Sequence, residues 1–134
     1  MAGGIAMILL DTCAMLWLAL DQSGLSQRAK VSLQERAGGL CISAISAFEI
    51  GQKVGSGKLK LKLKPGLWFP RACELHGLEV IALTAEAALA AAALPPLHKD
   101  PFDRLLIATA ITQGLPILTP DEKIRQYPQI KTLW

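Results

Sequence analysis

Four of the eleven acidic residues occupy similar places in the sequence: each closely follows a short apolar run or lies in the first turns of an expected helix. They are Asp11, Glu49, Asp103 and Asp121. In an open parallel sheet, groups at the carboxyl ends of strands and at adjoining helix starts meet at one edge, where ligands bind. Carboxylates gathered there repel one another and suit a hard divalent cation. Such a site could activate water and neutralise charge on a phosphodiester.

Most of these acids also have a purely structural explanation. A carboxylate near a helix N-terminus stabilises the helix dipole. Thr119–Glu122 has capping-box spacing with proline at the first helical position, Ser46–Glu49 has the same spacing, and Asp100 could cap the helix that contains Asp103. Capping does not account for Asp11, which ends an apolar strand where burial of a carboxylate is costly without a partner. From the residues alone, a metal site and a set of caps both remain open.

Short apolar segments alternate with helical patterns, which indicates an α/β fold with a mostly parallel sheet. Strands are expected at 8–10, 40–42, 79–82, 116–118 and 131–134. Helices are expected at about 12–20, 26–37, 44–54, 67–76, 85–94, 101–113 and 120–125. Because short, continuously apolar strands are buried on both sides, helices should cover both faces of the sheet.

The composition fits one globular domain over residues 1–134, with residues 1–6 as a loose leader. Hydrophobic residues make up 51% and charged residues 19%, which argues against disorder. The net charge of +3 permits an acidic partner without requiring one. No apolar run is long enough to span a membrane, and no basic region precedes the apolar start as in a secretory signal. Three cysteines without a CxxC pair predict reduced thiols in a cytoplasmic protein.

Four segments together resemble the motifs of the PIN family, in the subgroup of VapC-like toxins. They are Ile8–Thr12, Ser43–Ile50, His98–Ala110 and Leu118–Glu122. The third segment, HKDPFDRLLIATA, is the most specific, and the order and spacing of all four cover nearly the whole chain. Cys13 stands where the subgroup often has histidine, and Phe48 where it often has tryptophan.

The resemblance implies an α/β/α sandwich with a central parallel sheet of four or five strands. It implies a homodimeric endoribonuclease that uses Mg²⁺ or Mn²⁺, acts as the toxin of a toxin–antitoxin pair and is inhibited by an antitoxin protein. Carried over by position, the metal-binding and catalytic residues are Asp11, Glu49, Asp103 and Asp121. Asp100 is the alternative to Asp103, because residues three apart share a helix face. Asp103 is preferred, since its spacing to the small residues that follow fits the PIN pattern.

Basic residues offer a path for RNA. Lysines at 58, 60, 62 and 64 alternate with leucines, so they would share one side of an extended segment and could follow an RNA backbone. The alternative is a solvated edge whose lysines block sheet pairing, with leucines serving the dimer or the antitoxin. Arg104 could contact phosphate or form a helix salt bridge. His98 could assist proton transfer or make a structural hydrogen bond ahead of its helix.

Two other kinds of protein share some of these features. A phospho-receiver-like regulatory domain also gathers acids at strand ends, but it usually has adjacent acids after its first strand, whereas Thr12 follows Asp11 here. A non-catalytic module that keeps the fold would have no need for all four acids. These features argue against a phospho-receiver-like domain and a non-catalytic module, which remain the two alternatives to a metal-dependent ribonuclease.

Overall fold

Five short strands pair in parallel in one sheet, in the order β3-β2-β1-β4-β5. The computed structural model describes residues 6–134, so the predicted leader lies outside the described residues except for the exposed Ala6. The strands are β1 (Ile8–Leu10), β2 (Leu40–Ser43), β3 (Leu78–Ile81), β4 (Ile117–Leu118) and β5 (Thr132–Leu133). The prediction of a mostly parallel sheet of four or five strands is confirmed, with every pairing among these strands parallel.

Helices alternate with the strands along the chain. They are α1 (Thr12–Leu20), α2 (Gln27–Glu35), α3 (Ala44–Gly55), α4 (Pro65–His76), α5 (Ala85–Ala93), α6 (Pro101–Gln113) and α7 (Glu122–Arg125), with a 3₁₀ turn η1 (Gln22–Gly24) after α1. Proline starts α4 and α6, where its missing N–H costs nothing. Gly77 and Gly114 end these two helices with φ of 66° and 67°, the left-handed conformation that glycine adopts without strain.

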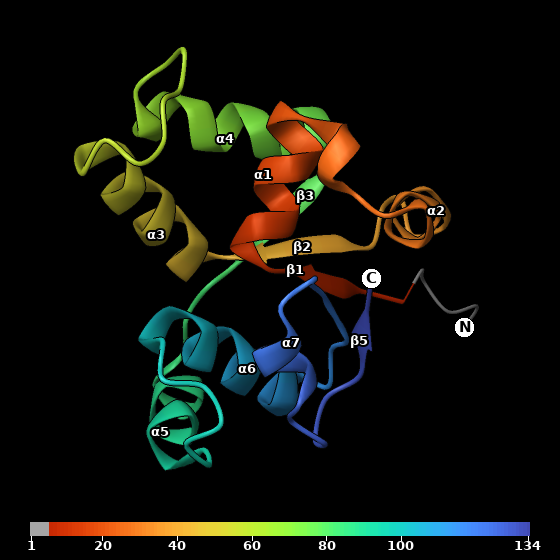
Figure 1. Ribbon diagram of the computed structural model, residues 1–134, viewed down its shortest axis with the longest axis vertical. Coiled ribbons are helices and arrows are strands. Elements are labelled where there is room, and N and C mark those ends of the chain that lie inside the picture. Colours follow the sequence, from red (N-terminus) through yellow and green to blue (C-terminus); the bar gives the residue numbers. More distant parts are fainter. Residues whose placement is uncertain (1–5) are drawn as a thin grey trace.

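Alternating side chains of the strands pack into two cores, one on each face of the sheet. Ile8 and Leu10 of β1 face a core that includes residues of α1, α2, α3 and α4. Leu9 faces the opposite core, with Leu106 and Ile107 of α6 and Ile124 of α7. Figure 1 shows the corresponding layers, with α1, α3 and α4 on one side of the strands and α5, α6 and α7 on the other. This arrangement confirms that helices cover both faces of the sheet.

The lysine-rich segment is a loop between α3 and α4 and forms no strand. Bends at Lys58, Lys62 and Leu63 interrupt the extended segment expected from the alternation. The alternation still shows in burial, because the lysines are exposed while Leu59 and Leu61 pack against the core. Those two leucines therefore anchor the loop to its own domain. None of the helices described in residues 6–134 is both long and apolar enough to cross a membrane.

Candidate active site

Asp11 is buried at the junction of β1 and α1, and both of its carboxylate oxygens accept hydrogen bonds. The N–H of Ala14 donates to Oδ1 over 2.7 Å, and the hydroxyl of Thr119 donates to Oδ2 over 2.5 Å. The first bond makes Asp11 the N-cap of α1, so the expectation that capping does not account for this residue is wrong. Burial nevertheless raises the pKa of Asp11 to about 6, and the charges of Asp121 and Glu49 add to that rise.

Glu49 lies in the second turn of α3 and has no part in capping that helix. The N-cap is Ser43, whose hydroxyl accepts the N–H of Ile45, so the capping box predicted for Ser46–Glu49 is wrong. The hydroxyl of Ser46 instead accepts a hydrogen bond of 2.8 Å from Thr12, which joins the starts of α1 and α3. Oε1 of Glu49 is buried without a hydrogen-bond partner among the described residues. An unpaired buried carboxylate oxygen is costly, so this atom is available to a water molecule or a ligand in the grooves that Glu49 lines.

The two acids at the start of α6 have separate roles. Oδ1 of Asp100 accepts the N–H groups of Phe102 at 2.8 Å and Asp103 at 3.3 Å, so Asp100 is the N-cap, as its place before Pro101 predicts. Asp103 does not cap the helix. Burial raises the pKa of the Asp103 carboxyl to about 7, with the negative charge of Asp100 as the next largest cause. The carboxylate of Asp103 is the one that faces the cleft described below.

Asp121 is the N-cap of α7, with the N–H groups of Lys123 and Ile124 donating to its Oδ1 over 2.8 and 3.4 Å. The predicted cap at Thr119, with Pro120 as the first helical residue, is therefore shifted by two positions. The reason is that the hydroxyl of Thr119 donates to Asp11, while its oxygen accepts the N–H of Asp121 over 3.0 Å. One threonine thus fixes two of the acids relative to each other.

The four acids selected from the sequence line one cleft of about 270 Å³ at the carboxyl ends of β1 and β4. The residues around it that bear on its chemistry are Asp11, Thr12, Glu49, Lys53, Asp103 and Asp121. Phe48 and Phe102, whose ring centroids are 5.6 Å apart, pack the start of α3 against the start of α6 and so set the spacing between Glu49 and Asp103. A group of carboxylates of this kind can hold a divalent cation through hard oxygen ligands.

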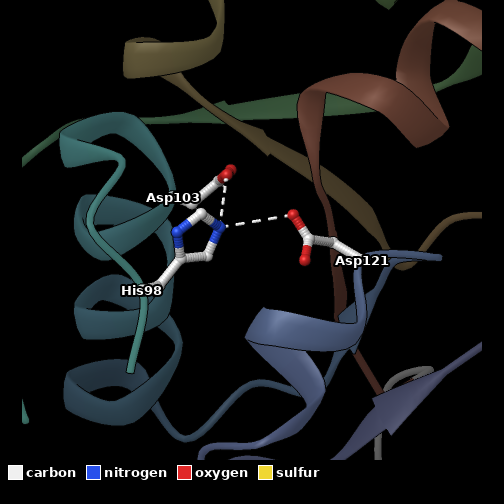
Figure 2. A group of neighbouring side chains, drawn as sticks. All are labelled: His98, Asp103 and Asp121. Carbon is white, nitrogen blue, oxygen red and sulfur yellow. Dashed lines mark hydrogen bonds and ion pairs between the residues drawn. The ribbon is translucent and has the colours of Figure 1, made fainter. Parts of the chain in front are cut away.

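Two basic residues lie beside the acids: Lys53 was not assigned to the site from the sequence, and His98 was left between proton transfer and a structural hydrogen bond. Lys53 lines the cleft; it follows Glu49 by four residues, the spacing that places two side chains on one helix face, and that signal was available. His98 is buried and lies between two acids (Figure 2), with Nε2 2.9 Å from Oδ2 of Asp103 and 3.3 Å from Oδ2 of Asp121. The three ligand atoms lie within 4.8 Å of one another. The contact with Asp121 spans 23 residues and had no sequence signal.

The predicted basic contacts to RNA are placed differently from one another. Lys58 lines a second groove of about 480 Å³, which shares Glu49 and Lys53 with the acidic cleft. Lys60, Lys62 and Lys64 are exposed on the loop beyond it. The guanidinium of Arg104 instead donates hydrogen bonds to four backbone carbonyls, those of Ala91, Leu94, Pro95 and His98. The Arg104 guanidinium is therefore hydrogen-bonded within the chain, and this geometry gives no support to a phosphate contact.

The sequence of residues 8–130 matches the PIN domain family. The chain belongs to the PIN domain family. It is 32% identical over 130 residues to ribonuclease VapC22 of Mycobacterium tuberculosis, an alignment that covers 95% of this chain and 98% of that protein. The resemblance inferred from the four motifs is thereby confirmed.

Solved structures share the fold at low sequence identity. The VapBC2 complex of Rickettsia felis, bound to a DNA fragment from its promoter, matches with a TM-score of 0.69 and 19% identity, over 94% of this chain and 97% of the other. FitAcB of Neisseria gonorrhoeae matches with a TM-score of 0.67 and 20% identity, over 94% of this chain and 96% of the other. These likenesses show that the PIN fold predicted from the motifs is correct.

Proposed function

We propose that this PIN domain is a metal-dependent endoribonuclease that hydrolyses RNA phosphodiester bonds and acts as the toxin of a toxin–antitoxin pair. The observation that carries the proposal is the cleft in which Asp11, Glu49, Asp103 and Asp121 converge. The relative at 32% identity is named a ribonuclease, and it aligns over nearly the full length of both chains. A phospho-receiver-like domain or a non-catalytic module is not favoured by this kinship.

The residues of the cleft fit Mg²⁺ or Mn²⁺. Carboxylate oxygens are the ligands that both ions prefer, and a cation would supply the partner that Oε1 of Glu49 lacks among the described residues. The raised pKa values of Asp11 and Asp103 are caused mainly by burial, and the neighbouring negative charges add to the rise. We assign the ligand role to Asp11, Glu49, Asp103 and Asp121. Asp103 is favoured over Asp100 because Asp103 lines the same cleft as Asp11, Glu49 and Asp121, whereas Asp100 lines the neighbouring groove.

When bound, the ion would activate a water molecule and neutralise charge on the phosphodiester. The chain itself holds the carboxylates in place. Asp11 is fixed by hydrogen bonds to both oxygens, and Asp121 is held by the backbone of α7. Within residues 6–134, Oε1 of Glu49 accepts no hydrogen bond, which leaves this oxygen available to a ligand. Lys53, at the rim that the two grooves share, can bind a phosphate oxygen of the substrate.

We assign the path of the RNA strand to the groove that contains Lys53 and Lys58. The N–H groups of Lys58 and Leu59 both donate to the carbonyl of Lys53, over 2.9 and 3.1 Å, so the loop returns to the end of α3 and holds the two lysines close together. The remaining lysines at 60, 62 and 64 would add a diffuse positive field along the same loop.

We further propose an antitoxin partner and a homodimeric state. Several of the structural neighbours are toxin–antitoxin complexes, such as the VapBC complexes of Rickettsia felis and Salmonella typhimurium. The free thiols of Cys13, Cys41 and Cys73 fit a reducing compartment, so we place the activity in the cytoplasm.

The decisive experiment is cleavage of a labelled single-stranded RNA by the purified protein with Mg²⁺, with Mn²⁺ and with EDTA. We expect cleavage only with metal, and loss of most activity in Asp11→Asn with a native circular dichroism spectrum. Asp21→Asn is the matched control, because Asp21 is an exposed acid that caps the turn η1 away from the cleft. Activity of Asp11→Asn within about tenfold of wild type contradicts the proposal, since a site carboxylate should contribute several kcal/mol to the transition state. A single-stranded DNA of the same sequence tests the preference for RNA.

A further inference from the structure

We propose that His98 is a positioning residue: its Nε2, hydrogen-bonded to Asp121 and in ion-pair contact with Asp103, keeps the two carboxylates together, and the ring does not bind the metal. The inference rests on the proposed metal site. The three side chains come from three separate places, since His98 precedes α6, Asp103 lies in its first turn and Asp121 caps α7 (Figure 2). Their ligand atoms are close enough that a site made of one imidazole and two carboxylates is the obvious alternative.

The hydrogen on the imidazole ring is assigned by the group that faces its other nitrogen. The backbone N–H of Asp100 donates to Nδ1 of His98 over 3.2 Å. A ring nitrogen that accepts a hydrogen bond carries no hydrogen, so in the neutral ring the hydrogen is on Nε2. Nε2 is therefore a donor: its hydrogen bond is to Oδ2 of Asp121 at 3.3 Å, while Oδ2 of Asp103 lies 2.9 Å from the same nitrogen in an ion-pair contact.

Metal binding would require the opposite arrangement. A histidine that binds a metal through Nε2 carries its hydrogen on Nδ1 and donates it to a carbonyl or carboxylate. Here Nδ1 faces a backbone N–H, which cannot accept a hydrogen bond. The start of α6 holds that N–H in place, because Asp100 is the N-cap residue and Pro101 follows it. The surroundings of the ring thus favour hydrogen-bond donation over metal ligation.

The backbone of His98 is fixed on both sides, so the ring has a defined position. Its N–H donates to the hydroxyl of Tyr127 over 2.9 Å, and its carbonyl accepts from Arg104 over 3.0 Å. The hydroxyl of Tyr127 donates onward to the carbonyl of Pro95 over 2.8 Å. Only 6% of His98 is exposed. A buried, anchored donor between two like charges offsets their repulsion and leaves the other oxygen of Asp103 available to a cation.

Two substitutions separate positioning from mere structural support. In His98→Gln the amide nitrogen can reach about the place of Nε2, so the variant can still donate to Asp121 and lie against Asp103. In His98→Asn the shorter amide can replace only the atoms near Nδ1, so it can accept from Asp100 but does not reach the carboxylates. The measurement is the Mn²⁺ dissociation constant, from the electron paramagnetic resonance signal of free Mn²⁺. Melting in EDTA reports the structural cost of each change.

We expect His98→Gln to bind Mn²⁺ within about threefold of wild type, and His98→Asn to bind it about 10- to 100-fold more weakly, the usual loss when a group that orients a ligand is removed. An equal loss in both variants, or wild-type affinity in His98→Asn, overturns the proposal. RNA cleavage is not part of this measurement, so a failure to cut RNA does not affect it.

Nitrogen NMR of the wild-type protein labelled in histidine tests the hydrogen position without any change to His98. We expect the hydrogen on Nε2 and none on Nδ1, both without metal and with saturating Mg²⁺. The signals of the second histidine are assigned with His76→Gln. Migration of the hydrogen to Nδ1 on addition of Mg²⁺ would show ligation and overturn the proposal. If no metal binds at all, the proposed metal site fails, while the metal-free spectrum alone decides whether Nε2 is the donor.

Discussion

The hydroxyl of Thr119 donates to Oδ2 of Asp11 over 2.5 Å, joining two residues that lie 108 positions apart. The bond connects the end of β4 to the end of β1, and the same threonine accepts the N–H of Asp121. Thr119 is completely buried, so water does not compete for either bond. Thr119, which has no ionisable side chain, therefore positions Asp11 and Asp121 at one edge of the acidic cleft.

Replacing Thr119 by valine should destabilise the fold and raise the pKa of Asp11 further, because the threonine hydrogen bond opposes the effect of burial on that pKa. Loss of a buried hydrogen bond to a charged group should lower the free energy of unfolding by about 1.5–3 kcal/mol. Urea unfolding at pH 7 measures it. Thr112→Val is the control, since the Thr112 hydroxyl bonds only to a carbonyl of its own helix among the described residues. A loss no larger than in the control would contradict this role.

Mn²⁺ should stabilise the protein, because it binds the folded cleft and has no comparable site on the unfolded chain. At about a hundredfold above its dissociation constant the gain is roughly 2.7 kcal/mol. For a domain of this size, that corresponds to a rise in Tm of about 10 °C. Asp103→Asn should lose most of this rise, whereas its melting temperature in EDTA should be near or above that of wild type.

Asp100→Asn is the matched variant for that experiment, because asparagine caps a helix as well as aspartate does. It should keep the α6 cap and retain most of the Mn²⁺ shift. If Asp100→Asn loses the shift and Asp103→Asn retains it, the assignment of the ligand between these two acids is reversed.

Stability without metal should depend on pH in the direction opposite to that of an ordinary salt-bridged acid. The pKa of Asp11 is raised to about 6 and that of Asp103 to about 7, both from 3.8, so between these values the folded state binds more protons than the unfolded state. The corresponding stability is fully present below about pH 3.8 and is lost as the pH rises through 6 and 7. In EDTA, the contribution of these two acids to the free energy of unfolding should therefore fall from pH 4 to pH 8.

The double variant Asp11→Asn/Asp103→Asn should flatten this pH profile, and urea unfolding of both proteins across the range measures it. Because the ligands must be deprotonated to bind a cation, the Mn²⁺ shift of the wild-type protein should be larger at pH 8 than at pH 5.5. A Mn²⁺ shift that is independent of pH would mean that neither carboxyl binds the ion.

The groove beside α3 predicts which lysines bind RNA. In the Asp11→Asn background, where cleavage is suppressed, Lys53→Gln/Lys58→Gln should weaken RNA binding and reduce its salt dependence. On a single strand, the slope should fall by about 0.7 for each phosphate that the variant no longer neutralises. Lys62→Gln/Lys64→Gln has the same charge change on the exposed part of the loop and should alter the slope less. Equal changes in the two pairs would favour a diffuse field over a defined groove.

The sheet and the place of the acids could be predicted because both follow local patterns. The run Ile8-Leu9-Leu10 indicates a buried strand, and the acid after it must lie at the carboxyl end of that strand. The four acids of the cleft lie at strand ends and near helix starts, and for that reason they could be selected from the sequence. Their role as metal ligands stays a prediction.

What the sequence did not reveal depends on contacts between distant segments. The cap of α7 lies at Asp121 because the hydroxyl of Thr119 donates to Asp11, and no pattern within residues 119–122 contains that information. Likewise, the contact of His98 with Asp121 depends on the loop path set by Arg104 and Tyr127. Helix propensity alone cannot determine which residue caps α7 or which group His98 contacts, because several acceptors compete for each N–H at a helix start.

The central position of β1 has a consequence for synthesis of the chain. β1 is the first strand of the sheet to be made, yet its neighbour β4 and the partner Thr119 follow it by more than a hundred residues. Chains fold from the N-terminus during translation, and contacts of long sequence separation form late. Two of the four acids, Asp103 and Asp121, are therefore absent from a nascent chain that ends before them, and such a chain has no assembled acidic site. A PIN domain built in this way has no complete acidic cleft until strands have formed on both sides of β1.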